Sequence, residues 1–395
     1  MSDLKIFAKT IDEKAKAQID LLLAQPAFAD CKVRIMPDVH AGAGCVIGFT
    51  ADLGKKVIPN IVGVDIGCGM LTVKIGKIDI DFEKLDRVIR DNVPSGMNVN
   101  EVANSPVNLR ELKCYDNLKN IDWIEKSMGS LGGGNHFIEV DADDDGNKYL
   151  VIHTGSRNIG KQVAEYYQAM AISLLNGKEK LKTAIAEYIR ECKENGRENE
   201  IESGIKELKR QFKPIAEIPN ELCYLEGEWR HKYLWDMGYC QYFAIMNRRE
   251  ISNKIIRGMG WNVLESFETI HNYIDMRSNI VRKGAISAKK GERVLIPVNM
   301  RDGCIIGIGK GNEDWNCSAP HGAGRIMSRM QARENLKLED YQQTMSGIYT
   351  TSVSTDTIDE APQAYKPMQE IIDCIGDTVE IERIIKPVYN FKASE

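Results

Sequence analysis

The stretch KVIPNIVGVDIGCGMLTVKIG, residues 56–76, sets short runs of β-branched residues between glycines. Runs of Val, Ile and Thr favour β-strands, and glycine permits the tight turns that join them. The same texture extends back to residue 30 and returns at residues 128–160 and 284–326. We therefore expect three strand-rich regions whose strands are joined by glycine turns.

Helical patterns lie between these regions. Residues 161–213 are rich in Ala, Leu, Glu and Lys, with apolar residues at helical spacing and breaks near Asn176-Gly177 and Asn195-Gly196. We expect two or three amphipathic helices there, forming a peripheral arm over approximately residues 161–225. Residues 228–258 predict a better-buried helix. No repeat and no low-complexity linker divides the chain, so the pattern indicates one α+β unit with a helical insertion.

The composition is that of an ordinary globular protein, with 395 residues, 43% of them hydrophobic, and a formal net charge of −5. The mild acidity argues against a broad basic surface for nucleic acid, so any such contact must come from a local patch or from bound metal. No run of about 18 apolar residues predicts a membrane helix. Ten cysteines without a CxxC pair or a secretory leader pattern indicate reduced thiols and a cytoplasmic location.

The histidines are the most informative residues. The chain has only six, and five of them lie beside glycine, asparagine or aspartate in loop-like contexts: His40, His136, His153, His271 and His321. Catalytic groups concentrate on loops that a rigid scaffold presents. A single histidine is more often structural, but five in such contexts favour a functional site.

Asp65 and Cys68 add a carboxylate and a thiol in the glycine-flanked turn VDIGCGM. Alone, this pair is compatible with an aspartate that caps a turn beside a buried cysteine. Together with His136, His153 and His271 it makes a mixed oxygen, nitrogen and sulfur set, which suits Mn²⁺ or Zn²⁺ better than Mg²⁺ or Ca²⁺. Five ligands exceed one tetrahedral zinc, so two metals that share the thiolate fit better.

A third motif, SAPHGAGR at residues 318–325, leads His321 into a glycine turn. The glycine amides can face anionic oxygens, Arg325 can neutralise them, and a neutral imidazole nitrogen can attack phosphorus. A surface histidine on a glycine turn is the alternative, and His40 has a similar setting. The segment GGGNH at 132–136 lacks the Lys-Ser/Thr of a phosphate loop. The residues alone thus indicate a two-metal site, a histidine nucleophile and a phosphorylated substrate.

Taken in order, the motifs resemble the RtcB-type RNA ligases: DVHAGAGCVIG, VDIGCGM, GGGNHFIEV, HTGSRNIG, HNYID with RKGAI, PHGAGR, DEAPQAYK and KPVYNFK. The resemblance is weakest in the helical arm. It implies a single RtcB-like catalytic domain over residues 1–395, with central β-sheets around a deep active-site cleft. It also implies an enzyme of RNA repair or tRNA splicing that joins 2′,3′-cyclic phosphate or 3′-phosphate RNA ends to 5′-hydroxyl ends. GTP and two Mn²⁺ ions would be its cofactors, and archease a possible activating partner.

Carried over residue by residue, the resemblance implies that Asp65, Cys68 and His136 hold one manganese ion. Cys68, His153 and His271 would hold the other, and His321 would attack the α-phosphorus of GTP and become guanylylated. Glu139 would accept from the guanine edge and so select GTP over ATP. The further positions that match nucleotide contacts of the family are Asn135, His271, Asn272, Gly322, Ala323, Gly324, Arg325 and Lys392.

The chain also departs from the family pattern around residues 297–304. The run Pro-Val-Asn-Met-Arg-Asp-Gly stands where Pro-Gly-Ser-Met-Gly is usual, and Cys304 falls where a nucleotide-contacting serine is expected. Pro297, Asn299, Met300 and Cys304 remain candidate nucleotide contacts. Two other functions compete with the ligase: a dimetal phosphoesterase acting on cyclic phosphate ends without ligation, and a non-catalytic RNA-end binder. The retained His321 disfavours the binder, which needs no nucleophile.

Overall fold

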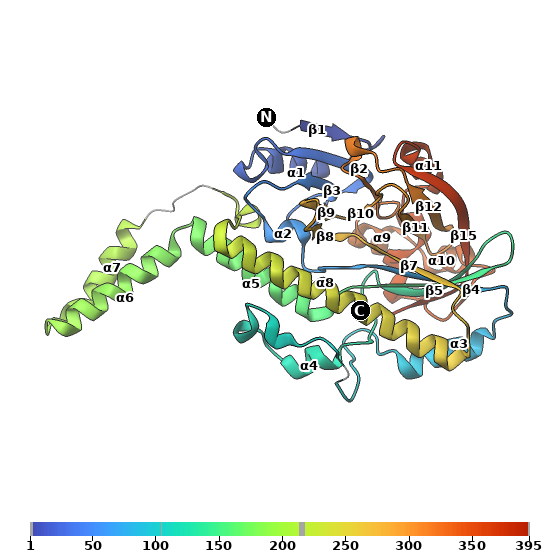
Figure 1. Cartoon of the computed structure of the whole chain (residues 1–395), viewed down its shortest axis with the longest axis horizontal. Helices are drawn as coiled ribbons and strands as arrows, with labels where there is room; N and C mark the ends of the chain where they lie inside the picture. Colours follow the sequence, from blue (N-terminus) through green and yellow to red (C-terminus); the bar gives the residue numbers. More distant parts are fainter. Residues whose placement is uncertain (1–2, 104, 213–217, 394–395) are drawn as a thin grey trace.

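The structure, a computed structural model, describes residues 3–103, 105–212 and 218–393. Helices and sheets are mixed along the chain, so the predicted α+β class is confirmed (Figure 1). The three strand-rich regions read from the glycine pattern all contain strands. The strands are β1 (Asp3–Ile6), β2 (Lys32–His40), β3 (Ile47–Asp52), β4 (Gly69–Gly76), β5 (Phe137–Ala142), β6 (Lys148–Thr154), β7 (Glu265–Ile270), β8 (Asn272–Asp275), β9 (Ile280–Lys283), β10 (Ala285–Ser287), β11 (Arg293–Asn299), β12 (Gly303–Gly309), β13 (Ser318–Pro320), β14 (Tyr349–Thr350) and β15 (Val379–Lys392).

The α-helices are distributed along the described ranges, and the longest ones lie in the middle of the chain. They are α1 (Glu13–Leu23), α2 (Pro59–Val62), α3 (Phe82–Asn92), α4 (Ile121–Lys126), α5 (Arg157–Leu175), α6 (Lys178–Glu194), α7 (Ile201–Gln211), α8 (Gly227–Met259), α9 (Arg329–Asn335), α10 (Leu338–Thr344) and α11 (Met368–Ile375). Short 3₁₀ turns connect them: η1 (Pro26–Phe28), η2 (Leu109–Glu111), η3 (Tyr115–Asn117), η4 (Glu198–Glu200), η5 (Asn220–Leu222), η6 (Glu313–Trp315), η7 (Thr355–Glu360) and η8 (Pro362–Ala364). In the described ranges, no helix joins the length and the apolar character that a bilayer crossing demands.

The largest sheet runs in the order β11-β12-β15-β5-β6-β4-β7, with β14 paired to β15. A second sheet has the order β1-β2-β3-β9-β8, and β10 pairs with β13 in a small third one. Strands from distant parts of the chain are therefore neighbours: β4 and β6 come from the first two strand-rich regions, and β7, beside β4, lies before the third.

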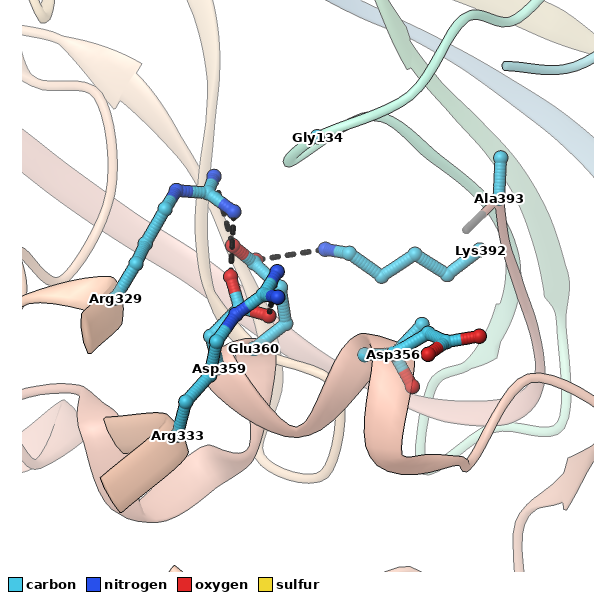
Figure 2. A pocket seen from close by; sticks show the side chains of 9 residues that line it. Gly134, Arg329, Arg333, Asp356, Asp359, Glu360, Lys392 and Ala393 are labelled. Carbon is cyan, nitrogen blue, oxygen red and sulfur yellow. Dashed lines mark hydrogen bonds and ion pairs between the residues drawn. The ribbon is translucent and has the colours of Figure 1, made fainter. Parts of the chain in front are cut away.

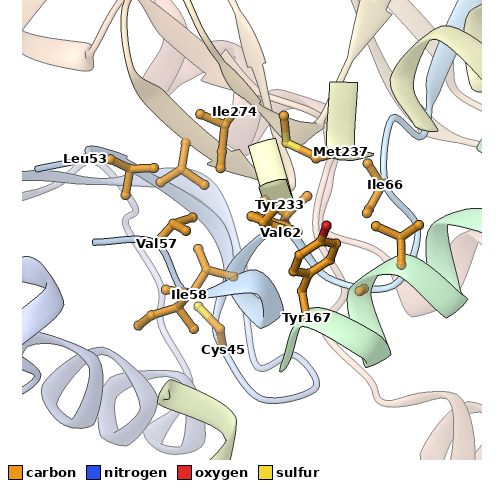
Figure 3. Packing of buried hydrophobic residues seen from close by; sticks show 14 of the residues in the cluster. Cys45, Leu53, Val57, Ile58, Val62, Ile66, Tyr167, Tyr233, Met237 and Ile274 are labelled. Carbon is orange, nitrogen blue, oxygen red and sulfur yellow. The ribbon is translucent and has the colours of Figure 1, made fainter. Parts of the chain in front are cut away.

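Helix α8 supports the large sheet, because it packs on β4 and β6 and also contacts α3 and α5. The predicted helix at 228–258 agrees with α8 within one residue at each end. Its buried face includes Tyr233 and Met237, which join Tyr167 of α5 and Val62 of α2 in the main core (Figure 3). Ile66 also belongs to this core and is fully buried. The core therefore anchors the turn that carries Asp65 and Cys68.

The helical stretch after residue 157 forms three helices, with breaks at Asn176-Gly177 and Asn195-Gly196 as the sequence predicted. Helix α5 buries Ile159 and Tyr167 in the main core. Helices α6 and α7 pack on each other and extend away from the body of the molecule (Figure 1). The projecting part thus begins after α5, later than residue 161.

Buried Asn247 of α8 ties the helix to the loops around the large sheet. Its Oδ1 accepts from the backbone N–H groups of Gly129 and Ser130, and its Nδ2 donates to the carbonyl oxygens of Ser130 and Gly155. Replacement of Asn247 by Ala leaves these buried groups unpaired, so we expect the free energy of unfolding to fall by about 2–4 kcal/mol. Denaturant titration measures it. Asn253→Ala, at an exposed position of the same helix, should change it by less than about 0.5 kcal/mol; equal effects would refute this role.

Candidate active site

Four of the predicted metal ligands lie at the same end of four adjacent strands. Cys68 directly precedes β4, His136 directly precedes β5, His271 directly follows β7, and His153 lies in β6. The strand order β5-β6-β4-β7 makes these positions neighbours, and the register sets Phe137 opposite His153. The expectation of a loop was wrong for His153, which lies inside β6, and for His40, which is the last residue of β2. Strand pairing therefore explains why ligands distant in sequence converge.

The ligand atoms approach one another closely. The Cys68 Sγ lies 3.2 Å from Nε2 of His153 and 3.6 Å from Nε2 of His136, whose Nε2 is 3.2 Å from Oδ2 of Asp65. Two groups form, Asp65–Cys68–His136 and Cys68–His153–His271, and in each the ligand atoms lie within 4.8 Å of one another. Cys68 belongs to both groups, as expected for a sulfur that two metals share.

The imidazole hydrogen bonds fit metal ligation. Nδ1 of His136 lies 2.9 Å from the Leu131 carbonyl oxygen, and Nδ1 of His153 lies 3.1 Å from the Asn135 carbonyl oxygen. A ring whose Nδ1–H donates to a carbonyl keeps a lone pair on Nε2, the atom that faces Cys68 here. Nδ1 of His271 is buried and meets no hydrogen-bond partner in the described part of the chain. A bound cation would satisfy such an orphaned nitrogen.

Burial controls the protonation of these groups. It lowers the pKa values of His153 and His271 well below the usual range, so both rings are neutral and able to ligate. Burial opposes ionisation of Asp65, but the hydrogen bonds from His136 and Cys68 and the charges of His136 and His153 together outweigh it and lower the pKa to about 2. Burial, and then the Asp65 charge, raise the pKa of the Cys68 thiol well above its usual range. A thiolate at this position needs a cation beside it.

Two glycines allow Asp65 and Cys68 to approach the other candidate ligands closely. Gly155, at the end of β6, lies against the Asp65 carboxylate, and a Cβ there would collide with it. Gly67 has a φ of 72°, and a Cβ on it would come 2.9 Å from the backbone of Gln241 on α8. Its left-handed conformation turns the chain between Asp65 and Cys68 so that both reach the same site.

The predicted nucleophile arrives from a different sheet. His321 directly follows β13, and its ring centroid lies 4.8 Å from that of His271. Its Nδ1 lies 2.7 Å from Oδ2 of Asp38, which also accepts from the backbone N–H groups of His321 and Gly322. Asp38 is fully buried in β2. The His321 imidazole is thus held in a fixed orientation beside the two candidate ligand groups.

Asp38 is not among the site residues that the sequence predicted. It lies two residues before His40 in the motif DVHAGAGCVIG. His40 itself ends β2, and its Nδ1 lies 2.9 Å from the Asp38 carbonyl oxygen. An acidic residue inside an apolar strand, next to a glycine turn, was the available signal.

Several predicted nucleotide contacts gather beyond the metal ligands. Glu139 is almost fully buried, accepts from Nδ2 of Asn390 at 2.7 Å, and has the Cys304 Sγ 3.8 Å away. Lys392, also buried, donates to Glu360 at 2.7 Å. Figure 2 shows this ion pair in the pocket that Gly134 and Lys392 help to line. A base lodged near Lys392 would meet both a cation and carboxylates.

Other predicted contacts are held by the protein itself. Arg325 donates to the carbonyl oxygens of Met327 and Asp359, to Glu360 and to the Tyr365 hydroxyl. A phosphate contact by Arg325 would have to replace one of these acceptors. Gly322 lies beside the Pro297 carbonyl and Gly324 beside the Asp38 backbone, while Ala323 and Met300 are buried. The side chain of Asn299 donates to Asp302, and that of Asn272 donates to the Asp65 carbonyl oxygen. Asn135 is exposed.

Comparison with known proteins agrees with this arrangement. The family model described as tRNA-splicing ligase RtcB matches residues 21–121 and 113–393. The RNA-splicing ligase RtcB of Escherichia coli K12 is 28% identical over 98% of this chain and 96% of its own length. The tRNA-splicing ligases RtcB of Nanoarchaeum equitans and Archaeoglobus fulgidus are 25% and 27% identical, each over 86% of this chain and 83% of their own length. From the matched residues, which include both ligand groups and His321, the chain belongs to the RtcB family.

Proposed function

We propose that this protein is a GTP- and Mn²⁺-dependent RNA ligase that joins 3′-phosphate or 2′,3′-cyclic phosphate ends to 5′-hydroxyl ends through guanylylated His321. The observation that carries the proposal is the position of the His321 ring, 4.8 Å from the His271 ring and held by Asp38. The names of the relatives, RNA-splicing and tRNA-splicing ligases, support RNA as the substrate.

Asp38 decides which nitrogen of His321 reacts. Its carboxylate accepts the Nδ1–H, so the lone pair remains on Nε2. Nε2 attacks the α-phosphorus of GTP, an N–P bond forms, the bond to the bridging oxygen breaks, and pyrophosphate leaves. The ring gains positive charge in this step, and the buried Asp38 carboxylate stabilises that charge.

The ligand groups account for the metals. Asp65, Cys68 and His136 would hold one Mn²⁺, and Cys68, His153 and His271 the other. When bound, the ions would withdraw charge from the phosphate oxygens.

The RNA steps follow from the His321 adduct. Water first opens a cyclic end to a 3′-phosphate. An oxygen of that phosphate then attacks the phosphorus of the guanylate, the N–P bond breaks, and Nε2 regains its lone pair. Finally the RNA 5′-hydroxyl attacks the activated 3′-phosphate and GMP leaves. Glu139 would accept from the N–H groups of the guanine edge, and Lys392 would contact the base.

The proposal also includes the cellular setting: one catalytic domain, a cytoplasmic location, a role in RNA repair or tRNA splicing, and an activating partner such as archease. The cysteines support a reducing compartment, because all ten are free thiols and eight are buried.

The central test is covalent labelling. Incubation with α-labelled GTP and Mn²⁺ should label the protein, and His321→Ala should abolish the label because no other group takes the place of Nε2. Acid-labile radioactivity on a denaturing gel measures it. His231→Ala, at an exposed position of α8, is the matched control and should label normally. An unlabelled wild-type protein that still opens cyclic phosphates would instead favour the phosphoesterase.

Cys68 should be essential for both metals, since its sulfur belongs to both ligand groups. We expect Cys68→Ala to lose nearly all bound Mn²⁺, whereas Asp65→Ala, which touches one group, should lose about one ion per chain. Elemental analysis after gel filtration gives the stoichiometry. Cys192→Ala, at a buried position on α6, controls for the loss of any thiol. Full occupancy in Cys68→Ala would refute the shared sulfur.

Asp38 should affect the reaction more than binding. Asp38→Asn removes the charge that stabilises the His321 ring, so we expect the labelling rate to fall about 100-fold or more. The apparent KM for GTP and the metal content should change little, because Asp38 contacts His321 and not the metal ligands. Rapid-quench labelling at varied GTP concentration separates the two constants. A rise in KM at constant maximal rate would contradict the assigned role.

A further inference from the structure

A second cluster of buried ionisable groups lies outside the predicted metal ligands. Glu139 and Asp141 project from the same face of β5, and Cys304 of β12 joins them. One ligand atom from each residue lies within 4.8 Å of the others. All three are buried, and Asp141 is completely inaccessible to solvent. No prediction from the sequence gave Asp141 a role.

Among the residues that the structure describes, the surroundings of Asp141 offer little to balance a negative charge. The neighbouring cluster is apolar, formed by Met70, Tyr149, Val151, Leu295, Cys304, Ile306 and Ile385. The Tyr149 hydroxyl donates to Asp143 and is not available. Over residues 3–103, 105–212 and 218–393, no nitrogen or oxygen donor reaches either oxygen of Asp141. An ionised Asp141 would therefore be buried beside Glu139 with only the weak donor of the Cys304 thiol to stabilise it.

Glu139 occupies the more polar side of the same cluster. Burial raises the pKa of Glu139, but the hydrogen bonds from Asp141 and from Asn390, which donates to its Oε2, and the charge of Lys392 on β15 oppose this rise. Two adjacent carboxylates in an apolar interior hold one proton between them, because ionising both costs several kcal/mol or more. The proton belongs on the member with the weaker partners, which is Asp141, since only the Cys304 thiol lies near it whereas Glu139 has Asn390 and Lys392. In agreement, burial and then the charge of Glu139 raise the pKa of Asp141 well above its usual range.

We propose that Asp141 is a protonated positioning residue that donates its carboxyl O–H to Glu139, and so keeps Glu139 ionised and oriented to accept hydrogen bonds from guanine. The part that concerns guanine rests on the proposed use of GTP; the shared proton does not. Asp141 touches no nucleotide and acts only through Glu139.

The arrangement explains how a buried glutamate can select a base. Glu139 has inward donors in Asn390 and Asp141, while the Cys304 thiol is a weak one. A carboxylate offers about four acceptor positions, so positions remain for the N–H groups of the guanine edge. Adenine presents an acceptor where guanine presents its ring N–H, and a fixed carboxylate repels it.

Infrared difference spectroscopy of the nucleotide-free protein tests the shared proton. Wild type minus Asp141→Asn at pH 7 should show the carbonyl band of a protonated carboxylic acid, which ionised carboxylates lack. Asp145→Asn, in the exposed turn after β5, is the matched control and should remove no such band. Absence of the band from the wild-type spectrum would overturn the proposal. So would elemental analysis in which Asp141→Asn loses a third metal, since a cation bound by Glu139, Asp141 and Cys304 would then replace the proton.

Self-labelling kinetics test the positioning role. Asn keeps an N–H donor at this position and Leu does not. We expect Asp141→Leu to raise the KM for GTP about tenfold or more, and Asp141→Asn to raise it less than about threefold. Discrimination against ATP should fall in parallel only in the Leu variant, and circular dichroism checks that it folds. Equal losses in both variants would refute positioning by a donated hydrogen bond. If the wild type takes no label from GTP, the proposed function fails, while the infrared result still decides the proton.

Discussion

The sulfur of Cys68 is the point on which the rest of the site depends. It lies 3.2 Å and 3.6 Å from two imidazole nitrogens, and it belongs to both candidate ligand groups. A thiol in such a buried position does not ionise without a cation, and a cation does not stay without an anionic ligand. Metal binding at this site, as proposed, would therefore be coupled to ionisation of Cys68. This coupling depends on the strand order β5-β6-β4-β7, because that order brings Cys68 and three histidines together at the same end of four neighbouring strands.

A second constraint joins the sheets. His321 comes from the small β10–β13 sheet, while Asp38, which holds its ring, comes from β2 in the five-stranded sheet. The neighbouring His271 directly follows β7, the last strand in the order of the large sheet. Its carbonyl oxygen accepts a hydrogen bond from the backbone N–H of Ala285 at the start of β10. The His321 ring is thus held where three sheets meet. Its position depends on their packing, and a shift of about 1 Å would be enough to impair the proposed in-line attack.

The interior near the site contains more charge than the sequence pattern suggested. Glu360 accepts from Lys392 and pairs with Arg325 and Arg329, and its pKa is lowered to about 2 although burial alone would raise it. On the other side, Glu139 and Asp141 lie together in an apolar cluster. One carboxylate is thus compensated by cations and the other pair by a proton, and both solutions lie beside the predicted nucleotide contacts.

The sequence by itself determined the local elements and the kinds of ligand. The glycine and β-branched texture predicted three strand regions, although β7, β8, β9 and β15 lie outside them. Asn176-Gly177 and Asn195-Gly196 marked the helix breaks, and the residue types indicated Asp65, Cys68 and the histidines as candidate ligands. Only the tertiary structure decided which groups meet. It places Asp38 against His321, and it shows that Arg325 donates to protein acceptors. It also shows that Asp141 is buried and that, in the described ranges, no nitrogen or oxygen donor reaches it. The physical reason is that periodicity and turn chemistry act over a few residues, whereas contacts between carboxylates and rings arise from strand order and sheet packing across almost the whole chain.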